Sequence, residues 1–182
     1  MLYRTHVVSS LAVGTALVVA TDYPFSADLV GGIMIGSVLP DIDEPNSFMG
    51  RRSLGLSLVI NRLFGHRGFT HSLVCWMFVT TICLLFSKPF TIGISLGFFL
   101  HILGDLFSTS GLRLFLPFSN KRVKMLITYK TGSSREQIIL YVCAALIVYL
   151  FLQNERLPIE LAESTASWFI YFINLIRSIL SL

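Results

Sequence analysis

The chain has 182 residues, of which 54% are hydrophobic and only 13% are charged, and its mean hydropathy is +0.74. Soluble globular domains carry about a quarter charged residues, so this composition excludes an ordinary soluble enzyme and indicates a polytopic membrane protein. The length suits one domain, residues 1–182. The net charge of +4 is better explained by basic loops on one side of a membrane than by a nucleic-acid partner.

Apolar runs of helical length occupy most of the chain and predict an all-α membrane bundle of about six helices. The predicted helices cover residues 7–21, 27–39, 71–87, 90–109, 136–152 and 164–182, with a possible interfacial helix at 54–64. Thr70 is a plausible N-cap for the third of the six, and residues 153–163 are expected to form a polar loop. Residues 1–136 carry the polar motifs, and the last two helices complete the bundle.

The first two runs are shorter than the hydrocarbon core of a bilayer. They are therefore expected to form a tight hairpin that does not span cleanly, or that spans only with local thinning. The second run contains Gly31, Gly32 and Gly36, which allow helices to approach closely in lipid.

Basic residues predict the orientation of this bundle. If six helices cross and the N-terminus is cytoplasmic, the loops 40–70 and 110–135 and both termini are cytoplasmic. Twelve of the 14 Lys and Arg then lie inside, and only Lys88 and Arg156 lie outside. Because positive charge favours the cytoplasmic side, the sequence predicts a multi-pass protein of the cytoplasmic membrane with both termini inside.

This orientation brings eight histidine and acidic residues to the cytoplasmic ends of the helices. They are His6, Asp41, Asp43, His66, His71, His101, Asp105 and Glu136. Imidazole and carboxylate groups are costly to desolvate unless they pair or coordinate a cation, so their clustering predicts a single metal site at this face.

Local spacing supports individual ligands. His101 and Asp105 are four residues apart on a predicted helix, so both side chains lie on one face and could bind one ion. Asp41 and Asp43 lie in a Pro40 to Pro45 segment that resists helix, and in an extended conformation they would point opposite ways. One of them could bind metal while the other orients a ligand or acts as a base.

Gly65 and Gly68 bracket His66 and Arg67, and allow the sharp turn that a coordinating loop needs. Simpler interpretations remain open for single residues, with His6 as an interfacial histidine and Glu136 as an acid at a helix N-terminus.

Nitrogen and oxygen donors without cysteine suit Zn²⁺, with Mn²⁺ as an alternative, and the eight groups suffice for two ions with positions left open for water. Open positions predict catalysis, in which a metal-activated water attacks a phosphoryl group. Arg67, and with it Arg51 and Arg52, could hold the phosphate, although the last two could equally be cytoplasmic anchors. The predicted catalytic residues are Asp43 and Arg67, and the predicted metal ligands are His6, Asp41, His66, His71, His101, Asp105 and Glu136.

From His6 to about Glu136 the chain resembles the YdjM family of inner-membrane proteins. The resemblance rests on His6, the run from Leu39 to Pro45 followed by Ser47 to Gly50, the run from Phe64 to Leu73, His101 to Gly111 with Pro117, and Gly132 to Glu136. The family is distantly similar to zinc-dependent phospholipases C and single-strand zinc nucleases. The resemblance implies a metal-dependent hydrolase of phosphate esters; Glu44 and Ser108 depart from the family pattern and receive no role.

The leading hypothesis is a membrane-embedded metal-dependent hydrolase that cleaves a phosphate ester of a lipid, a lipid-linked molecule or another small molecule at the cytoplasmic face. One alternative is a transporter of divalent cations or protons, but transporters place ionisable groups near the bilayer midplane. Another is a noncatalytic membrane protein with a structural metal. Nucleic acid is a possible but less favoured substrate, since no stacking aromatic residues are interleaved with the basic ones.

Overall fold

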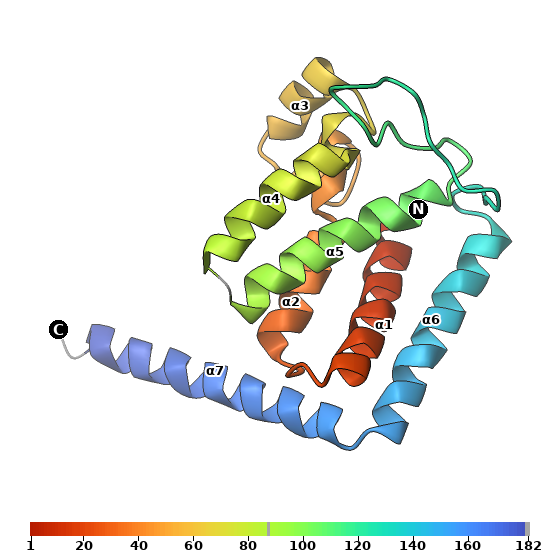
Figure 1. Ribbon diagram of the computed structural model, residues 1–182. Helices are drawn as coiled ribbons and strands as arrows, with labels where there is room; N and C mark the ends of the chain where they lie inside the picture. The colour runs from red at the N-terminus through yellow and green to blue at the C-terminus, as the bar shows by residue number, and fades with distance from the viewer. Residues whose placement is uncertain (87, 181–182) are drawn as a thin grey trace.

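The computed structural model describes residues 1–86 and 88–180, and these form seven α-helices and three short 3-10 helices (Figure 1). The elements are α1 (Tyr3–Thr21), α2 (Ala27–Gly36), η1 (Leu39–Asp43), η2 (Gly50–Arg52), α3 (Leu56–Phe64), η3 (Phe69–His71), α4 (Leu73–Phe86), α5 (Pro89–Leu106), α6 (Ser134–Gln153) and α7 (Arg156–Leu180). Within the described ranges, β structure is limited to two isolated bridges. The all-α prediction is therefore confirmed.

Three of the described helices are long and apolar enough to cross a membrane, namely α1, α5 and α6. The apolar helix α4 is shorter, with 14 residues, and α2 has only 10. A helix rises about 1.5 Å per residue, so α2 reaches only about half of a hydrocarbon core. The described helices thus include three candidate spans, fewer than the six predicted. Helix α2 is short, as the hairpin prediction expected, but α1 begins earlier than predicted and its 19 residues are enough to span.

The backbones of α2 and α5 touch along a row of glycines. A methyl group built on Gly32 would overlap the carbonyl oxygen of Phe90, and one built on Gly36 would overlap that of Ile94. Glycine at these positions lets two helices meet without side chains between them. Gly31, in contrast, faces only the ring of Phe90 at 3.9 Å, so two of the three glycines in this run make the close contact.

We expect Gly32→Ala to lower the thermal unfolding midpoint of the detergent-solubilised protein strongly, whereas Gly31→Ala leaves it nearly unchanged. The added methyl at residue 32 has no space against rigid backbone, and overpacking of this kind costs about 1–3 kcal/mol or more. Differential scanning fluorimetry of the two variants beside the parent protein is the measurement. Equal midpoints for both variants would contradict the glycine interface.

The polar ends of α1, α5 and α6 meet at one end of the bundle. In Figure 1 the start of α1, the end of α5 and the start of α6 lie near one another, beneath the loop that connects α5 to α6. The backbone N–H groups of Leu2 and Gly132 donate to Glu136 and so join the starts of α1 and α6, and the Met1 amino group contacts Asp105 near the end of α5. The segments η1 and η3 pack against each other at this end too.

Two local predictions are wrong. Residues 39–43 form a 3-10 turn rather than an extended strand, because Pro40 sits in the first turn of η1, where no backbone N–H is required. Thr70 does not cap α4; its hydroxyl donates to Asp43, and the Ser72 hydroxyl accepts from Cys75 N instead.

The polar loop predicted at 153–163 is also wrong, because α7 already begins at Arg156. Arg156 contacts Asp22 at 3.0 Å and Glu160 at 3.3 Å, so polar side chains of this stretch are satisfied on a helix. In Figure 1 α7 lies across the bundle end opposite the start of α1. The remaining helix bounds differ from prediction by a few residues, and positions 87 and 181–182 of the predicted helices lie outside the described residues.

Candidate metal centre

His101 is the central side chain of the candidate site and is fully buried on α5. Its Nδ1 lies 2.7 Å from the carbonyl oxygen of Ser37, which follows the last turn of α2. A carbonyl can only accept, so this nitrogen carries the proton and Nε2 keeps a free lone pair. The glycine contact between α2 and α5 brings the carbonyl to this place, and thereby selects the ring tautomer that can bind a metal.

Two further donors converge on His101 Nε2. His71 Nε2 lies 3.2 Å from it, and Asp41 Oδ1 lies 3.7 Å from it and 3.6 Å from His71 Nε2. Ligands of one tetrahedral zinc ion, each about 2.0–2.1 Å from the metal, stand about 3.4 Å apart. The three atoms therefore have separations that suit a shared cation.

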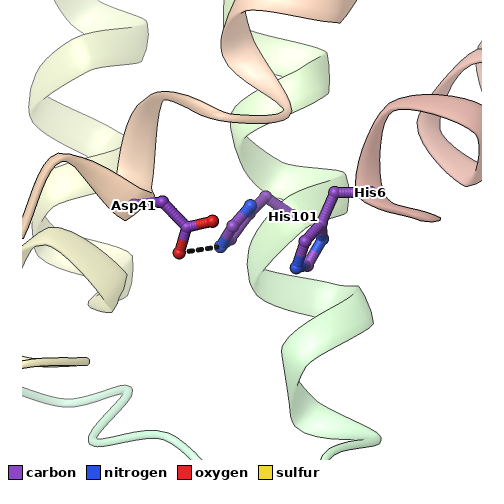
Figure 2. A group of neighbouring side chains, drawn as sticks. All are labelled: His6, Asp41 and His101. Carbon is purple, nitrogen blue, oxygen red and sulfur yellow. Dashed lines mark ion pairs between the residues drawn. The ribbon is translucent and has the colours of Figure 1, made fainter. Parts of the chain in front are cut away.

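His6 enters the cluster from α1. Figure 2 shows its ring lying face to face with that of His101, on the side away from Asp41, and the ring centroids are 3.8 Å apart. Neither nitrogen of this buried ring makes a hydrogen bond within the described part of the chain, although Nε2 lies 3.3 Å from Asp105 Oδ1. Buried polar atoms normally have partners, so a ring left unsatisfied here fits a missing ligand.

Asp105 lies one turn beyond His101 on α5, as the spacing predicted. Its carboxylate contacts the amino group of Met1 at 2.6 Å and the Arg67 guanidinium at 2.9 Å. Its second oxygen lies 3.9 Å from His71 Nε2. Two groups of three residues in the described chain could hold a metal ion, His6 with Asp41 and His101, and His71 with His101 and Asp105.

Asp43 lies behind these residues and is fully buried. One of its oxygens lies 3.1 Å from His71 Nδ1 and accepts from Thr70, and the other lies 3.2 Å from His66 Nδ1. A carboxylate that accepts from Nδ1 of a histidine leaves Nε2 free and directs it forward, as behind many protein-bound metals. These contacts suit an orienting role, one of the two roles that the sequence left open.

The site is strongly acidic. Burial acts to raise the pKa of Asp41, but His101 and His71 beside it outweigh burial and hold that pKa well below its usual value. Burial likewise disfavours the charged form of His71, but hydrogen bonds to Asp41 and Asp43 outweigh it and raise its pKa to about 9, so a metal ion would have to displace the proton on Nε2. The Met1 amino group and Arg67 offset the charge of Asp105, and a divalent cation bound at His71 Nε2 would take the place of the ring proton beside Asp41.

We expect Asp43→Asn to weaken metal affinity by about 10- to 100-fold, the usual cost of losing a carboxylate behind a ligating histidine. The amide cannot hold His71 Nδ1–H as a carboxylate does, so Nε2 loses its fixed direction and basicity. Competition with a chelating dye gives the affinity. Glu44→Gln is the matched control, since the Glu44 side chain is more exposed than that of Asp43. The histidine that it contacts is His66, at 3.5 Å, which belongs to neither candidate group. An unchanged affinity in Asp43→Asn would contradict this role.

Two predicted ligands lie outside both groups. His66 has a side chain that is 44% exposed and contacts Asp43 and Glu44. Glu136 is buried, but both of its oxygens accept backbone N–H groups, from Leu2 and Gly132. Glu136 therefore holds the start of α1 against the start of α6. The structure brings five of the seven predicted ligands together.

Arg67 reaches the cluster from a strained turn. Its φ is +54°, a left-handed conformation that is uncommon for a residue with a side chain. The guanidinium contacts Asp105, donates to the Ser108 hydroxyl at 2.9 Å and donates to that of Ser110. The predicted catalytic arginine is thus held beside a candidate ligand, where its remaining donors could meet an anion.

Four residues near the site were missed by sequence reasoning. They are Ser37, Thr70, Ser108 and Ser110. The polar run that follows Asp105 was a usable signal for the last two. No sequence signal points to Ser37, since it acts through its carbonyl.

Comparisons with known proteins agree with the membrane character of the fold. A family model described as YdjM inner membrane protein matches residues 1–178. The chain is 35% identical to "Uncharacterized protein YvsG" of Bacillus subtilis (strain 168), over 75% of this chain and 86% of that protein. It is 33% identical to "Inner membrane protein YdjM" of Escherichia coli (strain K12), over 82% and 76%. No solved structure matches the chain.

Proposed function

The chain belongs to the YdjM inner membrane protein family, and from the site geometry we propose that it is a membrane-embedded, metal-dependent hydrolase of phosphate esters. The observation that carries this proposal is the convergence of His6, Asp41, His71, His101 and Asp105, with two ring nitrogens 3.2 Å apart and a third imidazole without hydrogen bonds in the described structure.

The residues take distinct roles in this proposal. Three of the converging side chains hold a divalent cation, either His6, Asp41 and His101 or His71, His101 and Asp105. Asp43 and Ser37 keep the rings of His71 and His101 in the metal-binding tautomer. When bound, such a cation polarises a phosphoryl oxygen and makes a water molecule nucleophilic near neutral pH. Arg67 orients the phosphate through guanidinium donors, and Ser108 and Ser110 hold Arg67 in place.

Zinc is the favoured ion because the ligands are imidazole and carboxylate, and manganese is the alternative. The sequence predicted two ions. Both candidate groups use His101, whose Nδ1 is engaged by Ser37. Its one free nitrogen can bind only one ion, so the two groups are alternative positions for a single ion. Elemental analysis gives the number directly.

The proposed location of the site is the cytoplasmic face of the inner membrane. The site end carries Arg4 and the segments 40–70 and 107–135, which together contain eleven of the 14 Lys and Arg, whereas Lys88 and Arg156 lie at the starts of α5 and α7. Positive residues favour the cytoplasmic side. A site at headgroup level would meet lipids directly, and a phosphate-bearing lipid is therefore the favoured substrate.

Two rival functions remain as proposals of lower rank. A transporter of cations or protons would need ionisable groups along a path through the bilayer. The candidate ligands instead lie at helix ends. A structural metal would have all of its positions filled by protein. Each candidate group supplies three donors, which leaves an open coordination position on the ion and so favours catalysis.

The test of the proposed function is hydrolysis by detergent-purified protein, first stripped with chelator and then supplied with Zn²⁺ or Mn²⁺. Phosphatidic acid and p-nitrophenyl phosphate serve as lipid and soluble esters, and released phosphate or nitrophenol is measured. Metal-dependent release that is lost in Asp41→Asn supports the proposal. Bound metal without release from any phosphate ester would overturn it and favour the structural alternative.

A further inference from the structure

A cavity of about 310 Å³ lies beside the candidate metal centre, between the three helices that could span a membrane. Its walls come from α1 (Ser10 and Val13), α5 (Leu100 and Leu103), α6 (Ile139) and the loop between α5 and α6. The lining is almost entirely apolar, and the volume lies within the range of about 300–1,000 Å³ that is usual for small-molecule sites. Because its walls are helices suited to lipid, hydrocarbon is the natural content.

This cavity borders the candidate metal centre at Gly104, which lines it. A methyl group built on Gly104 would lie 2.9 Å from Met1 Sδ and 3.5 Å from His6 Nδ1, so the cavity wall at this residue is next to the His6 ring. Gly104 also precedes Asp105 directly. A molecule in the cavity would therefore have its polar end next to the candidate ligands and its apolar body among the helices.

One polar group in the cavity has no partner. Ser10 is 1% exposed, lines the cavity, and its hydroxyl makes no hydrogen bond in the described chain. The neighbouring Ser9 hydroxyl is satisfied by the carbonyl oxygen of His6. A buried hydroxyl without a partner is costly, and a carbonyl oxygen of a ligand is what its proton could meet.

A second apolar cavity, of about 540 Å³, lies on the other side of α1 and is lined by Val8, Val38 and Phe48 among others. None of its described lining residues has an unpartnered buried polar atom. Its polar lining side chains, Arg4 and Tyr3, hydrogen-bond to each other, whereas the first cavity holds an unpartnered hydroxyl, so the first cavity is the better candidate.

We propose that the cavity between α1, α5 and α6 binds one ester-linked acyl chain of a phosphate-bearing lipid, with the ester carbonyl on Ser10 and the phosphate at the metal-binding cluster. This inference rests on the proposed function and names the part of the substrate that the site selects. Since each buried methylene contributes about fourfold in affinity, the cavity makes a long-chain lipid a much better ligand than a soluble phosphate ester.

The test is photolabelling of the full chain in phosphatidylcholine vesicles that contain phosphatidic acid with a diazirine on its acyl chain. It is run with Zn²⁺ and repeated with chelator, and labelling in either condition requires no turnover. Labelled residues are mapped by mass spectrometry. We expect saturable labelling near residues 9–13 and 100–104 that excess unlabelled phosphatidic acid lowers at least fivefold. Labelling of the exposed α4 residues Met77, Phe78 and Leu85 should not be competed.

Matched variants sharpen the test. Val13→Phe fills the cavity and should lower the competed labelling severalfold, whereas Leu17→Phe, one turn away on α1 and similarly exposed, should not. Ser10→Ala should weaken competition by ester-linked phosphatidic acid about fivefold but leave competition by its ether-linked analogue unchanged.

Equal labelling of α4 and the cavity, unchanged by excess unlabelled lipid, would overturn the inference. Labelling that unlabelled lipid lowers only in the second cavity would overturn it too. Competed cavity labelling in a protein that hydrolyses no phosphate ester would support the lipid site and reject the proposed function. Hydrolysis of a phosphate ester without competed labelling of the cavity would support the proposed function and reject the lipid site.

Discussion

His101→Ala is expected to remove essentially all bound metal from the purified protein, lowering zinc or manganese from about one ion per chain to less than a tenth. Both groups of candidate ligands contain His101, so this substitution affects each of them, whereas removal of any other ligand affects one. Losing a ligand costs more than the 10- to 100-fold in affinity typical of residues behind a ligand. The measurement is elemental analysis after dialysis against trace metal.

His66→Ala is the matched control for this experiment. His66 belongs to the same polar cluster in sequence, but it is 44% exposed and lies outside both groups. We expect it to keep the parent metal content. His101→Gln, which fills more of the space of the ring, separates loss of a ligand from loss of packing. Full metal content in both His101 variants, or none in the parent protein after zinc and manganese are added, would reject the site.

Arg67→Lys is expected to lower kcat for phosphate-ester hydrolysis by about 100- to 1,000-fold, the usual effect of removing one donor from a preorganised anion site. The guanidinium contacts Asp105, Ser108 and Ser110 simultaneously. Lysine keeps the charge but presents a single ammonium group, and so cannot make the same planar set of contacts. Initial rates with phosphatidic acid at saturating metal are the measurement.

Metal content and thermal stability distinguish this effect from a collapse of the site. Lysine preserves a cation beside the buried Asp105, so we expect the metal content and the thermal stability of Arg67→Lys to stay close to those of the parent protein. Arg113→Lys is the matched control, because Arg113 is a loop arginine that donates to the carbonyl of Phe64. A full-rate Arg67→Lys protein would exclude Arg67 from the catalytic residues.

The sequence was sufficient for those parts of the structure that depend on local pattern. Apolar runs of helical length predicted the helices, and charged residues identified their polar ends. The spacing of His101 and Asp105 predicted that both would face one site, because residues four apart share a helix face. It misjudged segments in which capping and turn geometry decide, such as Leu39–Asp43 and the start of α7.

The choice among the candidate ligands could not be made from sequence. His66 and His71 look alike in the sequence, yet one is exposed and the other is buried against His101. Glu136 looked like a ligand because it begins a helix at the polar end, but backbone N–H groups from Leu2 and Gly132 occupy both of its oxygens. Each outcome depends on contacts between residues that are far apart in the chain.

The amino-acid sequence by itself determined that this is a helical membrane protein with histidines and carboxylates at one end of its helices, since hydropathy and periodicity are local properties. The tertiary structure alone decided which of them converge, because that depends on how closely α2 and α5 pack. Their glycine contact brings the Ser37 carbonyl to His101 Nδ1 and turns Nε2 toward His71 and Asp41. Ring orientation of this kind is a property of packing, and no residue spacing records it.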